Sequence, residues 1–148
     1  MKVEIKNVMI LNIIEYLHEL SLVRKHSRVR RDLIEKLSER HKKNEKTRIS
    51  IAEEHCKKDS TGKPLIVDKS YNIPDENLEK YKDDIDEFNN ELLVIDGGDN
   101  RELIRTMKTI LRKFEETEYS GKQSITYDYL CNAFKIDEND EEEADNEQ

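Results

Sequence analysis

The chain opens with alternating apolar and polar residues and continues with apolar residues at helical spacing. Val3 and Ile5 alternate with charged residues, which predicts a short strand. Residues 8–20 carry apolar side chains over a broad face and predict a helix that is central to the core. A longer helix is predicted from residue 28 to about residue 57, because this stretch contains neither glycine nor proline, and Ser27 is its predicted N-cap.

The apolar stripe of this long helix is clear only in its first half. Leu33 and Leu37 belong to the stripe, but the corresponding later positions are polar, at His41, Asn44 and Arg48. A helix whose apolar stripe fades has usually left the core. We therefore expect the second half of the helix to project into water or toward a partner.

Farther along the chain, two apolar runs predict strands and three amphipathic stretches predict helices. Gly62 in a polar run ends the long helix, and the apolar runs predict strands at 64–68 and 92–96. The predicted helices lie at 74–91, at about 101–114 after an N-cap at Asp99 or Asn100, and at 121–135. The last helix is expected to bury Ile125, Tyr129, Leu130, Ala133 and Phe134.

These elements indicate an α+β fold that is mostly α, with about five helices and a few short strands. The helices at 28–57 and 74–91 are predicted to form a long helical hairpin with a β-tip. The strands at 64–68 and 92–96 are expected to pair antiparallel. We predict a single α-rich domain over 1–136, followed by a disordered acidic C-terminal tail over 137–148 that has too little apolar surface to order itself.

Composition adds a thin core and an uneven distribution of charge. Apolar residues make up 34% of the 148 residues and charged residues 41%, against about 45–50% and about 25% in typical domains. The net charge is −8, from 34 acidic and 26 basic residues. Residues 137–148 hold eight acidic residues and no basic ones, so subtracting 8 from 34 leaves 26 acidic residues to balance the 26 basic ones in the body.

The balanced body nevertheless contains a strongly basic segment, 24–48, with eleven Lys or Arg and four Asp or Glu. On a helix that begins early enough, Arg24, Arg28 and Arg31 share one face and could contact phosphates, with an affinity that falls as salt rises. Alternatively the segment is a solvated helix with attractive i, i+4 pairs, or it binds a protein. The candidate partner-binding residues are Arg24, Lys25, Arg28, Arg30, Arg31, Lys42 and Lys43.

Two observations bear on which partner this segment and the tail would meet. Residues 22–57 contain no Phe, Tyr or Trp, whereas nucleic-acid-binding surfaces combine positive charge with aromatic or amide groups. This favours a protein partner over nucleic acid. The acidic tail is consistent with three roles: it keeps the chain in solution, it folds back on the basic helix, or it mimics nucleic-acid phosphate.

No motif for catalysis, a cofactor or a metal stands out. Cys56 and Cys131 are 75 positions apart and outside any C-x-x-C pair, which favours free thiols in a reducing cell interior. His41, His55 and Cys56 lack the spacing of a closed zinc site. The Gly-Lys of "DSTGKP" lacks the spacing of a phosphate-binding loop. The N-terminal apolar run is too short and too polar to span a bilayer, so no membrane segment is expected.

Five segments resemble a known family when read in order: "MKVEIKN", "EYLHELSL", "KHSRVRRDLIEKL", "DSTGKPLIVD" and "SGKQSITYDYLCNAF". The chain resembles, over most of residues 1–135, a domain-of-unknown-function family of small uncharacterised proteins of bacteriophages of Gram-positive bacteria, usually encoded among tail and lysis genes. The family pattern Lys-Gly-Lys-x-Ser-Arg-x-Arg corresponds to "VRKHSRVR", where Val23 and Arg24 depart from it. The matching residues are Lys25, Ser27, Arg28 and Arg30.

The resemblance implies a phage origin and the host bacterial cytoplasm as the setting, and it carries no activity. We therefore expect a non-enzymatic phage accessory protein that acts through protein–protein interaction. Its partner would be a phage structural component or a host factor such as a defence system. The alternative is a nucleic-acid-binding protein that uses the basic helix 24–48, and a hydrolase with an unrecognised site is a weaker third reading. The apolar stripes of the helices permit a monomer or a homodimer.

Overall fold

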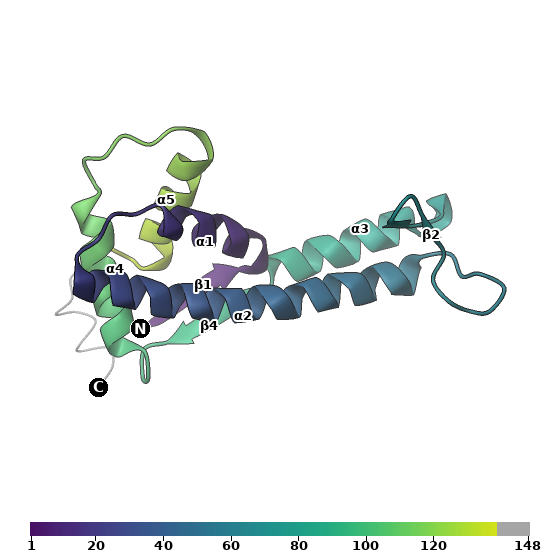
Figure 1. The fold of residues 1–148 in the computed structure, drawn as a ribbon, viewed down its shortest axis with the longest axis horizontal. Helices are drawn as coiled ribbons and strands as arrows, with labels where there is room; N and C mark the ends of the chain where they lie inside the picture. Colours follow the sequence, from purple (N-terminus) through teal and green to yellow (C-terminus); the bar gives the residue numbers. More distant parts are fainter. Residues whose placement is uncertain (139–148) are drawn as a thin grey trace.

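A mostly helical body carries a long arm made of two antiparallel helices (Figure 1). The computed structural model describes residues 1–138, so the predicted acidic tail lies outside the described residues except for Asp137 and Glu138. The described elements, in chain order, are β1 (Lys2–Lys6), the 3-10 turn η1 (Asn7–Met9), α1 (Ile10–His18), α2 (Arg24–His55), β2 (Ile66–Val67), β3 (Ser70–Tyr71), α3 (Asp75–Asn90), β4 (Leu92–Asp96), α4 (Arg101–Lys113) and α5 (Gly121–Ala133). The predicted class, mostly α with five helices and a few short strands, is confirmed for these residues.

The strand pairing differs from the prediction. β4 pairs antiparallel with β1, not with the apolar run at 64–68, and its register places Val3 opposite Ile95. The middle run instead folds onto itself as a small hairpin of β2 and β3. Its two turn residues, Asp68 and Lys69, have φ of 52° and 67°, which is the left-handed geometry that joins two strands through a two-residue turn.

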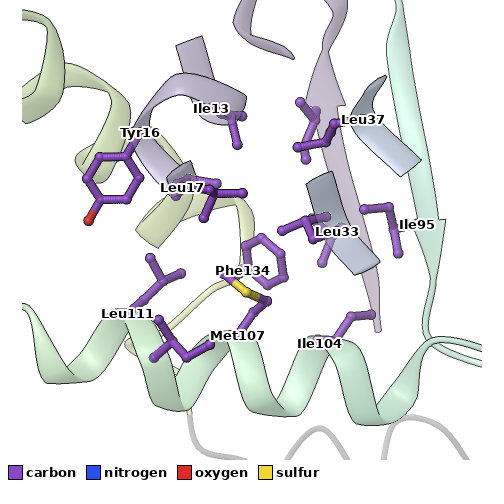
Figure 2. Packing of buried hydrophobic residues seen from close by; sticks show 14 of the residues in the cluster. Ile13, Tyr16, Leu17, Leu33, Leu37, Ile95, Ile104, Met107, Leu111 and Phe134 are labelled. Carbon is purple, nitrogen blue, oxygen red and sulfur yellow. The ribbon is translucent and has the colours of Figure 1, made fainter. Parts of the chain in front are cut away.

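The core lies between the inner face of the β1–β4 pair, α1, the first half of α2, α4 and the end of α5. Leu33 of α2 lies between Phe134 and Ile95 of β4, and Ile104 and Met107 of α4 face the same cluster (Figure 2). Each fully buried side chain of this size contributes about 1.5–3 kcal/mol to folding. The alternation that predicted β1 is confirmed, because Val3 and Ile5 are buried and their neighbours are exposed.

The last helix is rotated by about one residue from the predicted orientation. Leu130 and Phe134 are buried as predicted, but Ile125 is 67% exposed. Thr126 takes the inward position instead, one turn before Leu130, and its hydroxyl donates to the carbonyl oxygen of Lys122 at 2.9 Å. A threonine can occupy this position because the main chain of its own helix accepts its hydroxyl proton. Tyr129 and Ala133 are partly buried.

Helix α2 begins one turn earlier than predicted. Its N-cap is Val23, and Ser27 lies inside the first turn, where its N–H donates to the carbonyl oxygen of Val23 at 2.8 Å. The predicted capping role of Ser27 is therefore wrong. Asn100 does precede α4, but its side chain donates to the carbonyl oxygen of Asp96 at 3.1 Å and not to the helix.

Candidate functional site

The second half of α2 and α3 form the predicted helical hairpin with a β-tip, hereafter the arm. A buried polar network closes its base. Asn44 is 3% exposed, and its side-chain amide donates to Asn7 Oδ1 at 3.0 Å. Arg40 Nε donates to the same oxygen at 3.2 Å, and Asn7 Nδ2 donates to the carbonyl oxygen of Phe88 at 2.9 Å. The stripe of α2 fades here because its contacts become polar. The second half of α2 projects from the body, as predicted, and it does so paired with α3 (Figure 1).

The middle of the arm is also held by polar contacts. The guanidinium of Arg48 lies over the ring of Phe88, with its central carbon 5.3 Å from the ring centroid. It donates to Glu45 Oε1 at 2.8 Å and to Asn89 Oδ1 at 3.2 Å. Arg48 thereby occupies a position that a buried leucine would take in an apolar pair of helices.

Toward the far end of the arm, His55 and Asp84 join the two helices. His55 Nε2 lies 2.5 Å from Asp84 Oδ2, and Asn77 Nδ2 donates to the carbonyl oxygen of His55 at 2.9 Å. The ligand atoms of Glu54, His55 and Asp84 lie within 4.8 Å of one another, so these three residues could hold a metal ion. Sequence reasoning considered His55 and Asp84 separately and missed their pairing, because the two residues meet only when the arm folds. The direct bond between them accounts for their approach without an ion.

The tip of the arm presents two adjacent apolar side chains to solvent. Ile66 is 57% exposed and Val67 is 49% exposed. The tip is nevertheless well anchored, because the N–H of Lys57 donates to the carbonyl oxygen of Asn72 at 2.8 Å and the N–H of Leu65 donates to that of Lys57 at 2.7 Å. The apolar pair is therefore held at a fixed position beyond the end of α2.

Six of the seven predicted partner-binding residues are exposed, and Arg30 faces inward. The guanidinium of Arg30 donates to the carbonyl oxygen of Leu17 at 3.2 Å and to that of Leu20. It thereby caps the C-terminal end of α1, where the carbonyl oxygen of Leu17 also accepts the N–H of Leu20 at 3.3 Å. The exposed six are Arg24, Lys25, Arg28, Arg31, Lys42 and Lys43.

The six exposed residues form two groups and not one patch. Because α2 begins at Arg24, the residues Arg24, Arg28 and Arg31 do share one exposed face, as the sequence predicted for an early start. The second group, Lys42 and Lys43, begins about 16 Å beyond Arg31 along the helix axis. The exposed Glu35 and Glu39 separate the two groups.

Positive charge is concentrated where the start of α2 meets α4. The Nζ atom of Lys113 lies 2.6 Å from His26 Nδ1. Partial burial, and then the charges of Lys113 and Lys25, lower the pKa of His26 below its ordinary value of 6.5. The first turn of α2 contains no acidic residue, so the positive end of the helix dipole adds to these charges. The contribution of Lys113 was missed because α4 approaches only in the folded chain.

One cluster of tyrosine and cysteine side chains lies between α1 and α5. Tyr16 Oη is 2.9 Å from Tyr119 Oη, and Tyr127 donates to the carbonyl oxygen of Leu111 at 2.7 Å. Burial is the main cause that raises the pKa of Tyr16 and of Tyr127 far above the usual range, and burial also raises the pKa of the Cys131 thiol. These groups stay protonated at neutral pH, so the cluster packs the protein and offers neither a base nor a thiolate.

The remaining expectations concern membranes, disulfides and relatives. Among the described residues, no helix combines the length and the apolar character needed to cross a bilayer. Cys56 and Cys131 are free thiols. No family model matches the chain, and no curated protein or solved structure matches it either. The phage origin, the host setting and the partner therefore stay predictions from the sequence.

Proposed function

We propose that this protein is a non-enzymatic phage accessory protein that binds another protein, either a phage structural component or a host factor, through the end of its arm. The observation that carries the proposal is the exposed pair Ile66 and Val67 at the tip. Consecutive strand residues point to opposite faces, so each face of this projecting hairpin exposes one apolar side chain. A projecting element that is apolar on both faces is a candidate interaction site.

The tip is built to keep this pair in place. A two-stranded hairpin alone is marginally stable in water. Here Tyr71 Oη donates to Glu53 Oε1 at 3.1 Å, which ties β3 to the last turns of α2. Asp59 Oδ1 accepts the hydroxyl of Thr61 at 2.6 Å and the N–H of Lys63 at 3.1 Å, which orders the loop beside the hairpin. A partner would therefore meet a preformed surface, and preorganisation lowers the entropy cost of binding.

The sides of the arm extend this surface. Ile49 on α2 is 47% exposed and Leu78 on α3 is 36% exposed. Lys42 and Lys43 lie nearer the body and are exposed. Charges at the rim of an interface set the association rate and the choice of partner more than the affinity. The apolar tip would supply the affinity, and the lysines would steer the encounter.

A photo-crosslinking amino acid placed at position 66 tests the proposal in infected host cells. We expect one crosslinked adduct of defined mass, which disappears when Val67→Asp is added. Ile125 is the matched control, because it is also a strongly exposed isoleucine but lies on α5. The same adducts from positions 66 and 125, or no adduct from position 66, would remove the arm tip as the partner-binding surface.

Nucleic-acid binding is a second candidate, favoured by the exposed face of Arg24, Arg28 and Arg31 and by the positive charge around His26. The test is a titration with labelled duplex DNA, single-stranded DNA and RNA at two salt concentrations, with the chain ending at residue 136 compared with the full chain. Binding that falls steeply with salt and strengthens without the tail supports this candidate. No binding by either form at low salt rejects it.

A further inference from the structure

A groove runs between α2 and the outer edge of β4. Its walls are Lys36, Glu39, Arg40 and Lys43 on one side, and Leu93, Val94, Ile95 and Asn100 on the other. Consecutive side chains of a strand point to opposite faces of the sheet. Three consecutive strand residues can therefore line one groove only if the groove follows the edge of the strand, where the backbone groups lie.

This edge of β4 is the open edge of the sheet. Within residues 1–138, the sheet contains only β1 and β4, and β4 pairs with β1 along its other edge. At the outer edge of β1, by contrast, the N–H of Lys6 already donates to Tyr129 Oη of α5 at 2.9 Å. An open edge offers alternate N–H and C=O groups to an added strand.

The wall that faces this edge is basic. This wall contains three basic residues, Lys36, Arg40 and Lys43, and one acidic residue, Glu39. Lys36 and Arg40 are four residues apart on α2, which is about 6 Å along the helix axis, and Arg40 and Lys43 are three residues apart, which is about 4.5 Å. Alternate residues of a strand have a similar spacing of about 6.6 Å. Carboxylates at every second position of an added strand would therefore lie near successive cations of α2.

We propose that this groove binds an extended acidic segment of a partner protein, which joins the edge of β4 as a third strand and directs its carboxylates toward Lys36 and Lys43. The inference rests on the proposed protein-binding function only in that the occupant is a protein. The groove lies beside the body at the base of the arm, and the residues of the arm tip do not line it.

The geometry also admits a competing role for these lysines. Charged side chains beside an open edge keep it from pairing with the same edge of a second copy. In that role they would repel a second copy without binding any peptide. The two roles predict different outcomes when the charges of Lys36 and Lys43 are removed.

The test uses fluorescence polarisation of a labelled eight-residue peptide that alternates Glu and Val, with blocked ends, and the full-length protein. Controls are the Lys/Val peptide and two Glu/Val peptides with N-methyl groups at the odd or at the even residues. The Glu/Val peptide should bind, the Lys/Val peptide should not, and one of the two N-methylated peptides should lose binding. That asymmetry is expected because an edge strand donates only alternate N–H groups to its neighbour.

A matched pair of double variants tests the role of the basic wall. Lys36→Glu/Lys43→Glu should weaken binding of the Glu/Val peptide about tenfold, since two exposed attractive pairs become repulsive. Lys42→Glu/Lys46→Glu makes the same change of charge on the same helix at exposed residues outside the groove, and should leave the affinity within about twofold.

Four results would overturn the proposal: no binding of the Glu/Val peptide, equal weakening by both double variants, equal binding of both N-methylated peptides, or, for the neutral variant Lys36→Gln/Lys43→Gln, a dimer in sedimentation with unchanged peptide affinity. The last would assign the lysines to protection of the edge. Val67→Asp separates the two proposals, because it should abolish the crosslink from position 66 and leave peptide binding unchanged.

Discussion

Asn44 in the middle of α2 donates a hydrogen bond of 3.0 Å to Asn7 Oδ1 in the turn that follows β1. Both side chains are 3% exposed, so this bond forms away from water. It joins the base of the arm to the body at a position where the sequence has no apolar residue. The polar residues of α2 are therefore structural here, and they fix where the arm begins.

Replacement of Asn44 by alanine should lower the free energy of unfolding by about 1–3 kcal/mol, because Asn7 Oδ1 loses a donor in a buried site. Chemical denaturation measures this change. Asn90→Ala is the control, because Asn90 is exposed and bonds only to the carbonyl oxygen of Asp86 in its own helix, at 2.8 Å. That control should stay within about 0.5 kcal/mol. Equal stability of Asn44→Ala and the wild type would contradict the buried network.

Two isoleucines on different helices test the orientation of the core. Ile110 is fully buried on α4, and Ile125 is 67% exposed on α5. Ile110→Ala should cost about 2–5 kcal/mol through lost burial and the cavity that remains. Ile125→Ala should change stability by less than about 0.5 kcal/mol. Thermal unfolding of the two variants decides the point, and a large loss in Ile125→Ala would mean that α5 faces the core as its sequence alone suggested.

Local periodicity predicted the helices well because apolar spacing is a property of neighbouring residues. It could not predict the pairing of Val3 with Ile95, since that pairing depends on how distant segments meet. The burial of Thr126 in place of Ile125 was missed for a related reason. A hydroxyl that bonds to its own helix costs little to bury, so hydrophobicity alone ranks the two positions wrongly.

The candidate site was predictable in composition and not in geometry. The seven candidate basic residues of α2 could be identified from the sequence, and six of the seven are exposed. The inward turn of Arg30 could not be predicted, because its acceptors are backbone carbonyl groups of Leu17 and Leu20, which carry no sequence signal. The groove beside β4 was missed because its walls, α2 and β4, are far apart in the chain.

Arg30 and Arg31 are adjacent arginines with different environments, which gives a matched comparison. Arg30→Ala should lower the free energy of unfolding by about 1.5–3 kcal/mol, because carbonyl groups at the end of α1 lose a charged donor. Arg31→Ala removes an exposed side chain and should change stability by less than about 0.5 kcal/mol. Denaturant midpoints of both variants measure the difference. Equal midpoints would contradict the capping role of Arg30.

His26 should make the stability depend on pH near neutrality. Its pKa in the folded protein lies below the ordinary value of 6.5, because of partial burial and then the charges of Lys113 and Lys25. The unfolded chain therefore binds the proton more tightly. The contribution of His26 to the free energy of unfolding is therefore complete above about pH 6.5. It decreases as the pH is lowered below that value, and it is lost below the pKa that His26 has in the folded protein.

Lys113→Gln tests the electrostatic part of this shift. Removing the nearby positive charge should raise the pKa of His26 toward its ordinary value, as followed by NMR titration of the imidazole signals. Lys122→Gln is the control, because it removes a lysine whose partner is Glu15, at 2.9 Å, and not His26. A His26 pKa that is the same in Lys113→Gln and the wild type would show that the charge of Lys113 does not lower it. The start of α2 would then lack the concentrated positive charge that favours an anionic partner.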